Sequence, residues 1–373
     1  MSSGAEASQE SVTTGKRPVL GASAPNGPDL IYFDPALVDF ALANQGLSLK
    51  QFAAKTNLAF NTLRGLHRRQ GLHPSSALKI ASTLGLQVSD LFAPWDRRYR
   101  PPALAHGPAL GVAEWEMIDY LGSGRRTANG LYFIPCRLRH RHTAQRFGRG
   151  KFYHLSWVRE GLTADIRDKL SRHADVCARI TRHPQIVWNL SSTPTPAQDG
   201  WWVVDDWVGA QTLEDRLDSG PWPREERPRL LLEIAGGLSA LHAAGVIFRE
   251  LAPSRVLIAD ADGRAVLTDF ELAKLLDGVP SVSGDWPDDP FRAPELDGGA
   301  TTVAADLYSF GRLAATVLAG TVPDSGHEAA AFAGAGLPKR LQKLLLQSVA
   351  PFPAQRLAEL PPLLKELTRW AEA

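Results

Sequence analysis

The chain has 373 residues, of which 44% are hydrophobic and 22% charged, and its formal net charge is +1. This composition is typical of globular proteins and excludes collagen-like and highly charged disordered chains. No apolar run approaches the roughly 20 residues of a membrane helix, and residues 1–16 lack the features of a signal peptide. The two cysteines, Cys136 and Cys177, have no metal-ligand spacing and fit a reducing cytoplasm.

The small net charge conceals two basic blocks and one acidic block. Residues 46–100 carry 9 basic and 2 acidic residues, and residues 125–182 carry 14 basic and 4 acidic residues. Residues 199–306 are acidic, with 9 basic and 21 acidic residues. The basic blocks indicate either a polyanion partner or charge neutralisation against the acidic part of the chain.

The N-terminal third begins with a low-complexity stretch and continues with helical patterns. Residues 1–30 are rich in Ser, Gly, Ala and Pro, which predicts a disordered tail. Residues 31–93 predict an all-α domain of five short helices. Ser48 and Gln51 form the capping-box pattern that begins the second helix, and Asn57 is expected in the turn that follows it.

The order of these helices resembles the helix-turn-helix domain of the Cro and lambda-repressor class. In that class the third helix, here about residues 59–67, enters the major groove of DNA. Two positions depart from the class, since Leu49 replaces a usual Gln and His67 a usual Glu. The resemblance implies that the following side chains face DNA: Phe60, Asn61, Thr62, Arg64, His67, Arg68 and Arg69.

This resemblance makes DNA the expected partner of the first domain. Because specific recognition usually needs two half-sites, it also implies a homodimer or a larger assembly. The alternative is a helix-turn-helix that binds protein, and the basic excess of residues 46–100 favours DNA. Residues 94–113 contain four prolines without periodicity, which predicts a semi-rigid basic linker.

After the linker, short apolar patterns of period two predict strands. They are expected at residues 116–121, 131–138, 152–158 and 202–208, with a polar loop at residues 140–150.

The remainder of the chain predicts mainly helices. A long helix is expected from Arg229 to Ala244, followed by two short strands at residues 256–258 and 266–268. Further helices are expected between Pro338 and Ala373.

Several motifs follow one another in the order found in protein kinases. They are Phe248-Arg249-Glu250 in place of H-R-D, Asp269-Phe270-Glu271 in place of D-F-G, Arg292-Ala293-Pro294-Glu295 for A-P-E, and Asp306 and Arg356 at two anchoring positions. The chain therefore resembles a protein kinase over some 250 residues. The resemblance implies a multidomain protein in which the all-α helix-turn-helix domain precedes an α+β bilobal kinase-like fold, with an N-lobe at 114–207 and a C-lobe at 208–373.

The resemblance separates structural residues from residues of chemistry. Arg249, Asp306, Glu295 and Arg356 match positions that hold the C-lobe together, and all four are present.

The chemical positions are mostly altered. Asp269 keeps one metal carboxylate, and Glu250 keeps a carboxylate at the position of the catalytic base. Arg255 replaces the Asn that holds magnesium, and Ala252 replaces a Lys. Glu271 stands where the family has Gly. We therefore expect Arg255 to form an ion pair with Asp269 inside the metal site.

The nucleotide-binding positions are also incomplete. Gly122 and Gly124 stand in a degenerate glycine-rich loop, which in kinases covers the phosphates of ATP. Counting back from the Arg182-His-Pro motif places the phosphate-pairing lysine on His154, with Lys151 as the only local substitute.

Two further positions depend on that count. The Glu that should pair with the lysine falls near His173 or Ala174. Asp205 stands where kinases have an apolar residue beside the adenine pocket, so its carboxylate needs a partner if it is buried.

These features favour a pseudokinase that serves as a scaffold or switch in a bacterial, cytoplasmic transcription regulator, with a protein partner and without a membrane. One alternative is an active atypical Ser/Thr kinase that uses ATP and Mg²⁺, with Glu250 as base, Asp269 on the metal and Lys151 on the phosphates. Another is a nucleotide-sensing DNA-binding repressor.

Overall fold

The computed structural model describes most of the chain. The described residues are 30–68, 70–93, 96, 98, 114–121, 125–126, 132–155, 163–195, 200–276, 289–297 and 301–373. The tail expected at residues 1–29 and most of the linker expected at 94–113 lie outside them. No helix among the described residues combines the length and the apolar character needed to span a bilayer.

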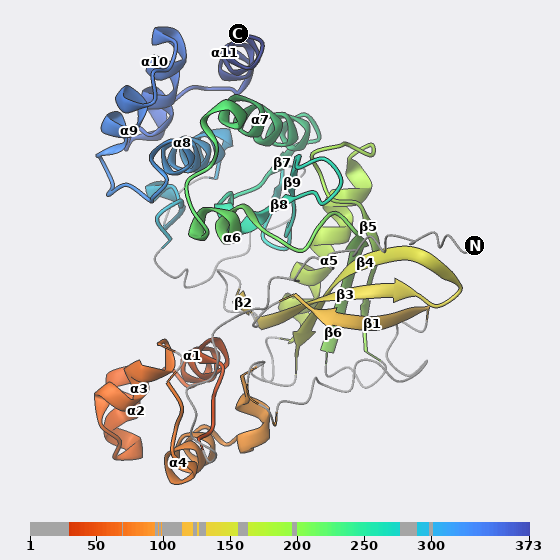
Figure 1. Ribbon diagram of the computed structural model, residues 1–373, viewed down its shortest axis with the longest axis vertical. Coiled ribbons are helices and arrows are strands. Elements are labelled where there is room, and N and C mark those ends of the chain that lie inside the picture. Colours follow the sequence, from red (N-terminus) through yellow and green to blue (C-terminus); the bar gives the residue numbers. More distant parts are fainter. Residues whose placement is uncertain are drawn as a thin grey trace, which may run out of the picture.

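The first elements are four α-helices and one 3₁₀ turn, drawn in red and orange in Figure 1. Their bounds are Pro35–Asn44 (α1), Leu49–Thr56 (α2), Phe60–Leu66 (α3), Pro74–Leu84 (α4) and Val88–Leu91 (η1). The expected capping box is confirmed, because Ser48 and Gln51 each bond the other's backbone N–H through their side chains. Phe52, Leu63 and Ile80 lie in a buried core that joins these helices.

A sheet of six antiparallel strands follows, in the order β1-β3-β4-β6-β5 with β2 paired to β3. The bounds are Trp115–Tyr120 (β1), Arg125–Arg126 (β2), Tyr132–His140 (β3), Thr143–His154 (β4), Asn189–Pro194 (β5) and Gly200–Asp206 (β6). Helix α5 (Thr163–Arg179) packs against β5 and β6, and α1 lies beside β2 and β3.

The prediction of a polar loop at residues 140–150 is wrong. The chain turns at residues 141–142 and continues as β4, which pairs with β3 from Phe133 to His140. This end of the hairpin is largely exposed, so polar side chains occupy it without breaking the backbone ladder. Polarity alone was therefore a misleading sign of a loop. The strand expected at residues 152–158 ends at His154, and residues 156–160 lie outside the description.

The rest of the chain is mainly helical and surrounds the long helix α7 (Figure 1). The helices are Leu213–Asp218 (α6), Arg227–Ala243 (α7), Val303–Ala319 (α8), Glu328–Gly334 (α9), Lys339–Ser348 (α10) and Pro361–Ala371 (α11). The short strands are Val246–Ile247 (β7), Val256–Ile258 (β8), Ala265–Leu267 (β9) and Lys274–Leu275 (β10), and the 3₁₀ turns are Arg224–Glu226 (η3), Pro253–Arg255 (η4), Pro294–Asp297 (η5) and Pro353–Gln355 (η6).

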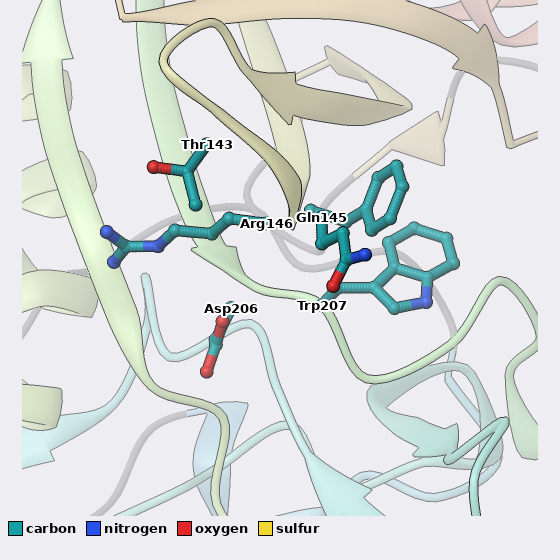
Figure 2. Close-up of a pocket in the computed structure, with 6 residues that line it drawn as sticks. Thr143, Gln145, Arg146, Asp206 and Trp207 are labelled. Atoms are coloured by element: carbon teal, nitrogen blue, oxygen red, sulfur yellow. The ribbon is translucent and has the colours of Figure 1, made fainter.

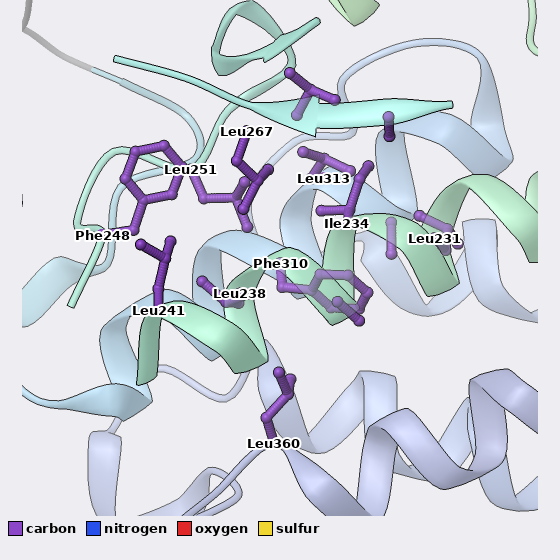
Figure 3. Close-up of a cluster of buried hydrophobic side chains, with 14 of the residues drawn as sticks. Leu231, Ile234, Leu238, Leu241, Phe248, Leu251, Leu267, Phe310, Leu313 and Leu360 are labelled. Carbon is purple, nitrogen blue, oxygen red and sulfur yellow. The ribbon is translucent and has the colours of Figure 1, made fainter. Parts of the chain in front are cut away.

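One apolar core supports the loops that follow α7. Figure 3 shows Ile234 and Leu238 of α7 facing Phe310 and Leu313 of α8, with Leu267 of β9 above them. All five side chains are fully buried. Since fully burying one such side chain contributes roughly 1.5–3 kcal/mol, this core holds the loops between β7 and β10 on a rigid base.

Candidate active site

A cluster of buried charges lies between β4 and the loops of the second lobe. Its first member is Lys151, whose side chain is 1% exposed. Its Nζ atom donates to Oδ1 of Asp269 at 2.8 Å and to Oε1 of Glu271 at 2.5 Å. Although burial disfavours the ammonium ion, the two carboxylates raise the pKa of Lys151 above its usual range. The lysine is therefore a fixed cation.

The position of Lys151 corrects the count made from the sequence. That count put the lysine position on His154, three residues further along the strand, whereas the structure brings Lys151 to Asp269. The error arises because the segment between β4 and α5 has no fixed length, so a motif beyond it cannot set the register of the strand. The side chain of His154 lies outside the described residues.

Tyr153 belongs to the same cluster and was missed by sequence reasoning. Successive odd-numbered residues of β4 share one face of the sheet, so Tyr153 points the same way as Lys151. Its hydroxyl donates to Oε1 of Glu271 at 2.6 Å. Burial, reinforced by Glu271 and Asp269, raises the pKa of Tyr153 well above its usual range. The spacing of two residues from Lys151 was the available signal.

Arg255 closes the other side of the cluster. It lies in η4, and its Nη1 atom is 3.2 Å from Oδ2 of Asp269, which confirms the ion pair expected from the sequence. Its Nη2 atom is 3.5 Å from Oε1 of Glu250. Against the effect of burial, Lys151 and Arg255 hold the pKa of Asp269 well below its usual range. Burial raises the pKa of Glu250 to about 7, although Arg255 opposes the shift.

A second buried pair lies between α5 and β6. Nε2 of His173 is 2.8 Å from Oδ1 of Asp205, and Nδ1 of the same ring accepts the backbone N–H of Phe270 at 3.1 Å. That arrangement assigns the ring proton to Nε2, which donates to the carboxylate. Asn189 donates to the same oxygen at 2.9 Å. His173 thus supports Asp205, and not Lys151 as the family pattern implied.

The four residues expected to hold the second lobe together lie in two contacts. Asp306 accepts the backbone N–H groups of Phe248 and Arg249 at 2.8 and 2.7 Å. Arg356 makes two bonds to Glu295, at 2.6 and 2.9 Å. Paired bonds of this kind are among the strongest side-chain contacts. The structure therefore keeps the loop that carries Glu250 in a fixed frame.

The metal positions do not fit magnesium. Among the described residues, no group of three or more His, Cys, Asp or Glu side chains is arranged to hold a metal ion. Asp269 faces Lys151 on one oxygen and Arg255 on the other, so both of its oxygens are directed at cations. A divalent ion at this carboxylate would meet two fixed positive charges within a few ångströms.

Some predicted site residues lie outside the described part of the chain. Gly122 and Gly124 are among them, so the glycine-rich loop is not described.

The predicted outward face of α3 is exposed where it is described. The Phe60 side chain is 43% exposed, and Asn61, Arg64, His67 and Arg68 are also exposed, whereas Thr62 is half-buried and Arg69 lies outside the description. Nε2 of His67 approaches Oδ1 of Asp39 on α1 at 3.5 Å. Apart from Phe60, the exposed side chains of this set are polar.

The protein kinase domain model matches residues 151–370, which is more than half of the chain. The chain belongs to the protein kinase family. The described lobes accordingly have its bilobal α+β fold. The kinase domain of PknI from Mycobacterium tuberculosis has a similar structure, with a TM-score of 0.52 at 20% identity, covering 72% of this chain and 100% of that one.

Bacterial serine/threonine-protein kinases are related in sequence. The chain is 34% identical to PkaB of Streptomyces coelicolor over 197 residues, covering 44% of this chain and 45% of that protein. It is 34% identical to pkn2 of Myxococcus xanthus over 171 residues, covering 44% and 20% respectively. For PknK of Mycobacterium bovis the identity is 31% over 162 residues, covering 43% and 14%. The match spans less than half the length of each relative.

Proposed function

We propose that the kinase-family domain of this chain does not transfer phosphate and serves as a scaffold or switch for a protein partner. The observation that carries the proposal is the buried guanidinium of Arg255, which bonds Asp269 and approaches Glu250. In active kinases that site holds magnesium, which neutralises the charge developing on the phosphates. A fixed guanidinium supplies positive charge there, but it cannot coordinate the phosphate oxygens as a metal ion does.

The other altered positions support the same conclusion. Glu271 brings a second carboxylate against Lys151, so the cation that would pair with phosphates is already neutralised by two anions. Ala252 has no charge to steady a transferring phosphoryl group. Because phosphoryl transfer depends almost entirely on positioning and electrostatics, these substitutions remove most of its machinery.

A transfer assay tests this proposal. The purified chain is incubated with ATP labelled at the γ-phosphate and with magnesium, and incorporation into the chain and into a generic protein substrate is measured. We expect no incorporation above that of a heat-denatured control. Incorporation that Glu250→Ala or Asp269→Ala abolishes would contradict the proposal, because contaminating kinases are insensitive to these substitutions.

An active atypical Ser/Thr kinase is the second candidate, favoured by one specific observation. The Lys151 ammonium group and the Asp269 carboxylate are both retained, 2.8 Å apart. In addition, burial raises the pKa of Glu250 to about 7, which lies in the range suited to a general base. In this case Arg255 would have to leave Asp269 before magnesium could bind. The transfer assay distinguishes the two candidates.

The helical region at residues 31–93 is proposed as a helix-turn-helix domain that binds DNA as a dimer. The proposal is supported by the exposed polar face of α3, which includes Asn61 and Arg64, and by the left-handed turn at Asn57 between α2 and α3. The basic excess of residues 46–100 adds attraction to phosphates.

Selection from random DNA duplexes tests this part of the proposal. We expect the intact chain to enrich a sequence with two half-sites. Arg64→Ala should weaken binding to it by about 1–3 kcal/mol if Arg64 reads a base. Lys79→Ala, an exposed substitution on α4, is the control. If the chain enriches no sequence and its binding to DNA does not depend on salt, the result favours the protein-binding alternative.

A further inference from the structure

The cleft between β4 and the second lobe contains a second buried arginine with no role in the family pattern. Arg149 precedes Lys151 by two residues on β4 and is 4% exposed. Its Nη1 atom donates to the backbone carbonyls of Gly209 and Ala210 at 3.1 and 3.3 Å. Those carbonyls belong to residues 207–212, the connection between β6 and α6 that joins the lobes.

Strand geometry shows what this position means for a ligand. Residues 149 and 151 share one face of β4 and lie about 6.6 Å apart along the strand. A nucleotide with phosphates at Lys151 must extend along the strand in one of two directions. One direction is closed by Tyr153, which is fully buried in an apolar cluster with Phe133 and Leu170.

The other direction leads past Arg149 to the connection between the lobes, where β4 pairs with the end of β6. A purine base held there would use the backbone polar groups of that connection. Arg149 already donates to two of its carbonyls from within the cleft. The Cζ atom of its neighbour Arg137 on β3 is 4.4 Å from the ring centre of Phe147 and 4.6 Å from that of Trp207.

The outer side of this region contains a pocket. A pocket of about 390 Å³ is lined by six residues: Thr143, Gln145, Arg146, Phe147, Asp206 and Trp207. Figure 2 shows Gln145 beside the indole of Trp207, and Arg146 extending away from it. Phe147 shares the face of β4 that carries Arg149, so the pocket begins next to the arginine and on its outer side.

We propose that the Arg149 side chain occupies the place of a nucleoside base in this cleft and thereby prevents purine nucleosides from binding there. The inference rests on the proposed function and extends it. Arg255 fills the metal position, Lys151 is neutralised at the phosphate position, and Arg149 fills the base position. The cleft is thereby held closed by the chain's own cations, without a bound nucleotide.

Adenosine is the probe that isolates the base position, because it carries no phosphate and needs no metal. Binding is measured by calorimetry and by thermal shift on the intact chain, with circular dichroism to establish folding. We expect Arg149→Ala to bind adenosine at least tenfold more tightly than the wild type. Arg149→Met fills the space without donating hydrogen bonds and should stay silent.

Arg139→Ala is the matched control, since Arg139 is exposed on β3 and pairs with Glu116 at the surface. It should remain silent as well. If Arg149→Ala fails to fold, Arg149→Ser provides the same test, because the serine side chain is polar and nearly as small as that of alanine.

Adenosine binding by the wild type as tight as by the opened variant would overturn the proposal, as would a folded opened variant that does not bind. Either result, with no phosphate transfer from labelled ATP, leaves the proposed function intact. Phosphate transfer by the wild type contradicts the proposed function itself.

Discussion

The guanidinium of Arg255 lies 3.2 Å from the Asp269 carboxylate, and both side chains are at most 8% exposed. Burying either charge without a partner would cost several kcal/mol, and the pairing offsets part of this cost. Asp269 remains ionised because Arg255 and Lys151 supply the positive charge that a metal ion would otherwise provide. Under the proposed function, the pair replaces the metal of an active kinase with a part of the chain.

Arg255→Asn should make the site responsive to magnesium. The substitution removes the buried cation from Asp269 and Glu250, and breaking a buried ion pair costs about 3–5 kcal/mol. We expect a lower melting temperature in metal-free buffer. Magnesium should then restore part of the loss, because a ligand at 100 times its dissociation constant stabilises by about 2.7 kcal/mol. Thermal melts with and without magnesium measure both effects.

The control for this experiment is Arg264→Asn, which changes a partly exposed arginine paired with Asp262. It should change stability by less than about 1 kcal/mol and confer no response to magnesium. If the wild type is stabilised by magnesium as strongly as Arg255→Asn, the guanidinium does not exclude the metal.

Glu250 should make stability depend on pH in a defined window. Its pKa rises from 4.5 to about 7 on folding, chiefly through burial. Between these values the folded state keeps the proton and the unfolded state releases it, so stability falls as pH rises through the window. Below pH 4.5 the contribution of the protonated Glu250 to the free energy of unfolding is fully present. The difference is on the order of 3 kcal/mol at most.

Glu250→Gln should abolish this dependence, because the amide does not titrate. Chemical denaturation at pH 5 and pH 7 measures the free energy of unfolding of both proteins. The wild type should lose more stability than the variant over this interval. Equal losses in the two proteins would show that Glu250 titrates normally in the folded state.

The sequence predicted the second lobe better than the first, for a physical reason. Arg255 and Asp269 lie on either side of the short β8–β9 hairpin, so their approach depends on local spacing that a motif captures. Lys151 lies more than a hundred residues from Asp269, and the length of the intervening loops is free. The same freedom hid the pairing of His173 with Asp205, although the need of Asp205 for a partner was predicted correctly.

Arg149 was missed because its partners are backbone carbonyls. No side-chain type in the sequence marks Gly209 or Ala210 as acceptors, and only the sheet register brings β4 to them. A signal was nevertheless present. Arg149, Lys151 and Tyr153 alternate along one strand and put three polar groups on a single face, which is unusual for a strand with buried faces.

Lys151→Met should destabilise the kinase-family domain strongly. The substitution removes the lysine from Asp269 and from Glu271, and Asp269 keeps its contact with Arg255. Loss of one partner from a buried cluster costs about 3–5 kcal/mol. Urea denaturation measures the loss, with Lys343→Met, an exposed substitution on α10, as the control. A loss below about 1 kcal/mol would mean that water reaches the carboxylates.

Substitutions of Asn57 test the local structure between α2 and α3 independently of any function. Its backbone has φ 53° and ψ 41°, the left-handed region that Asn and Gly tolerate better than other residues. Asn57→Ala should therefore cost about 1 kcal/mol, whereas Asn57→Gly should be nearly neutral. The side chain is exposed, so neither change disturbs the core. Denaturation of the two variants compares them directly, and equal stability would show that the turn carries no left-handed residue.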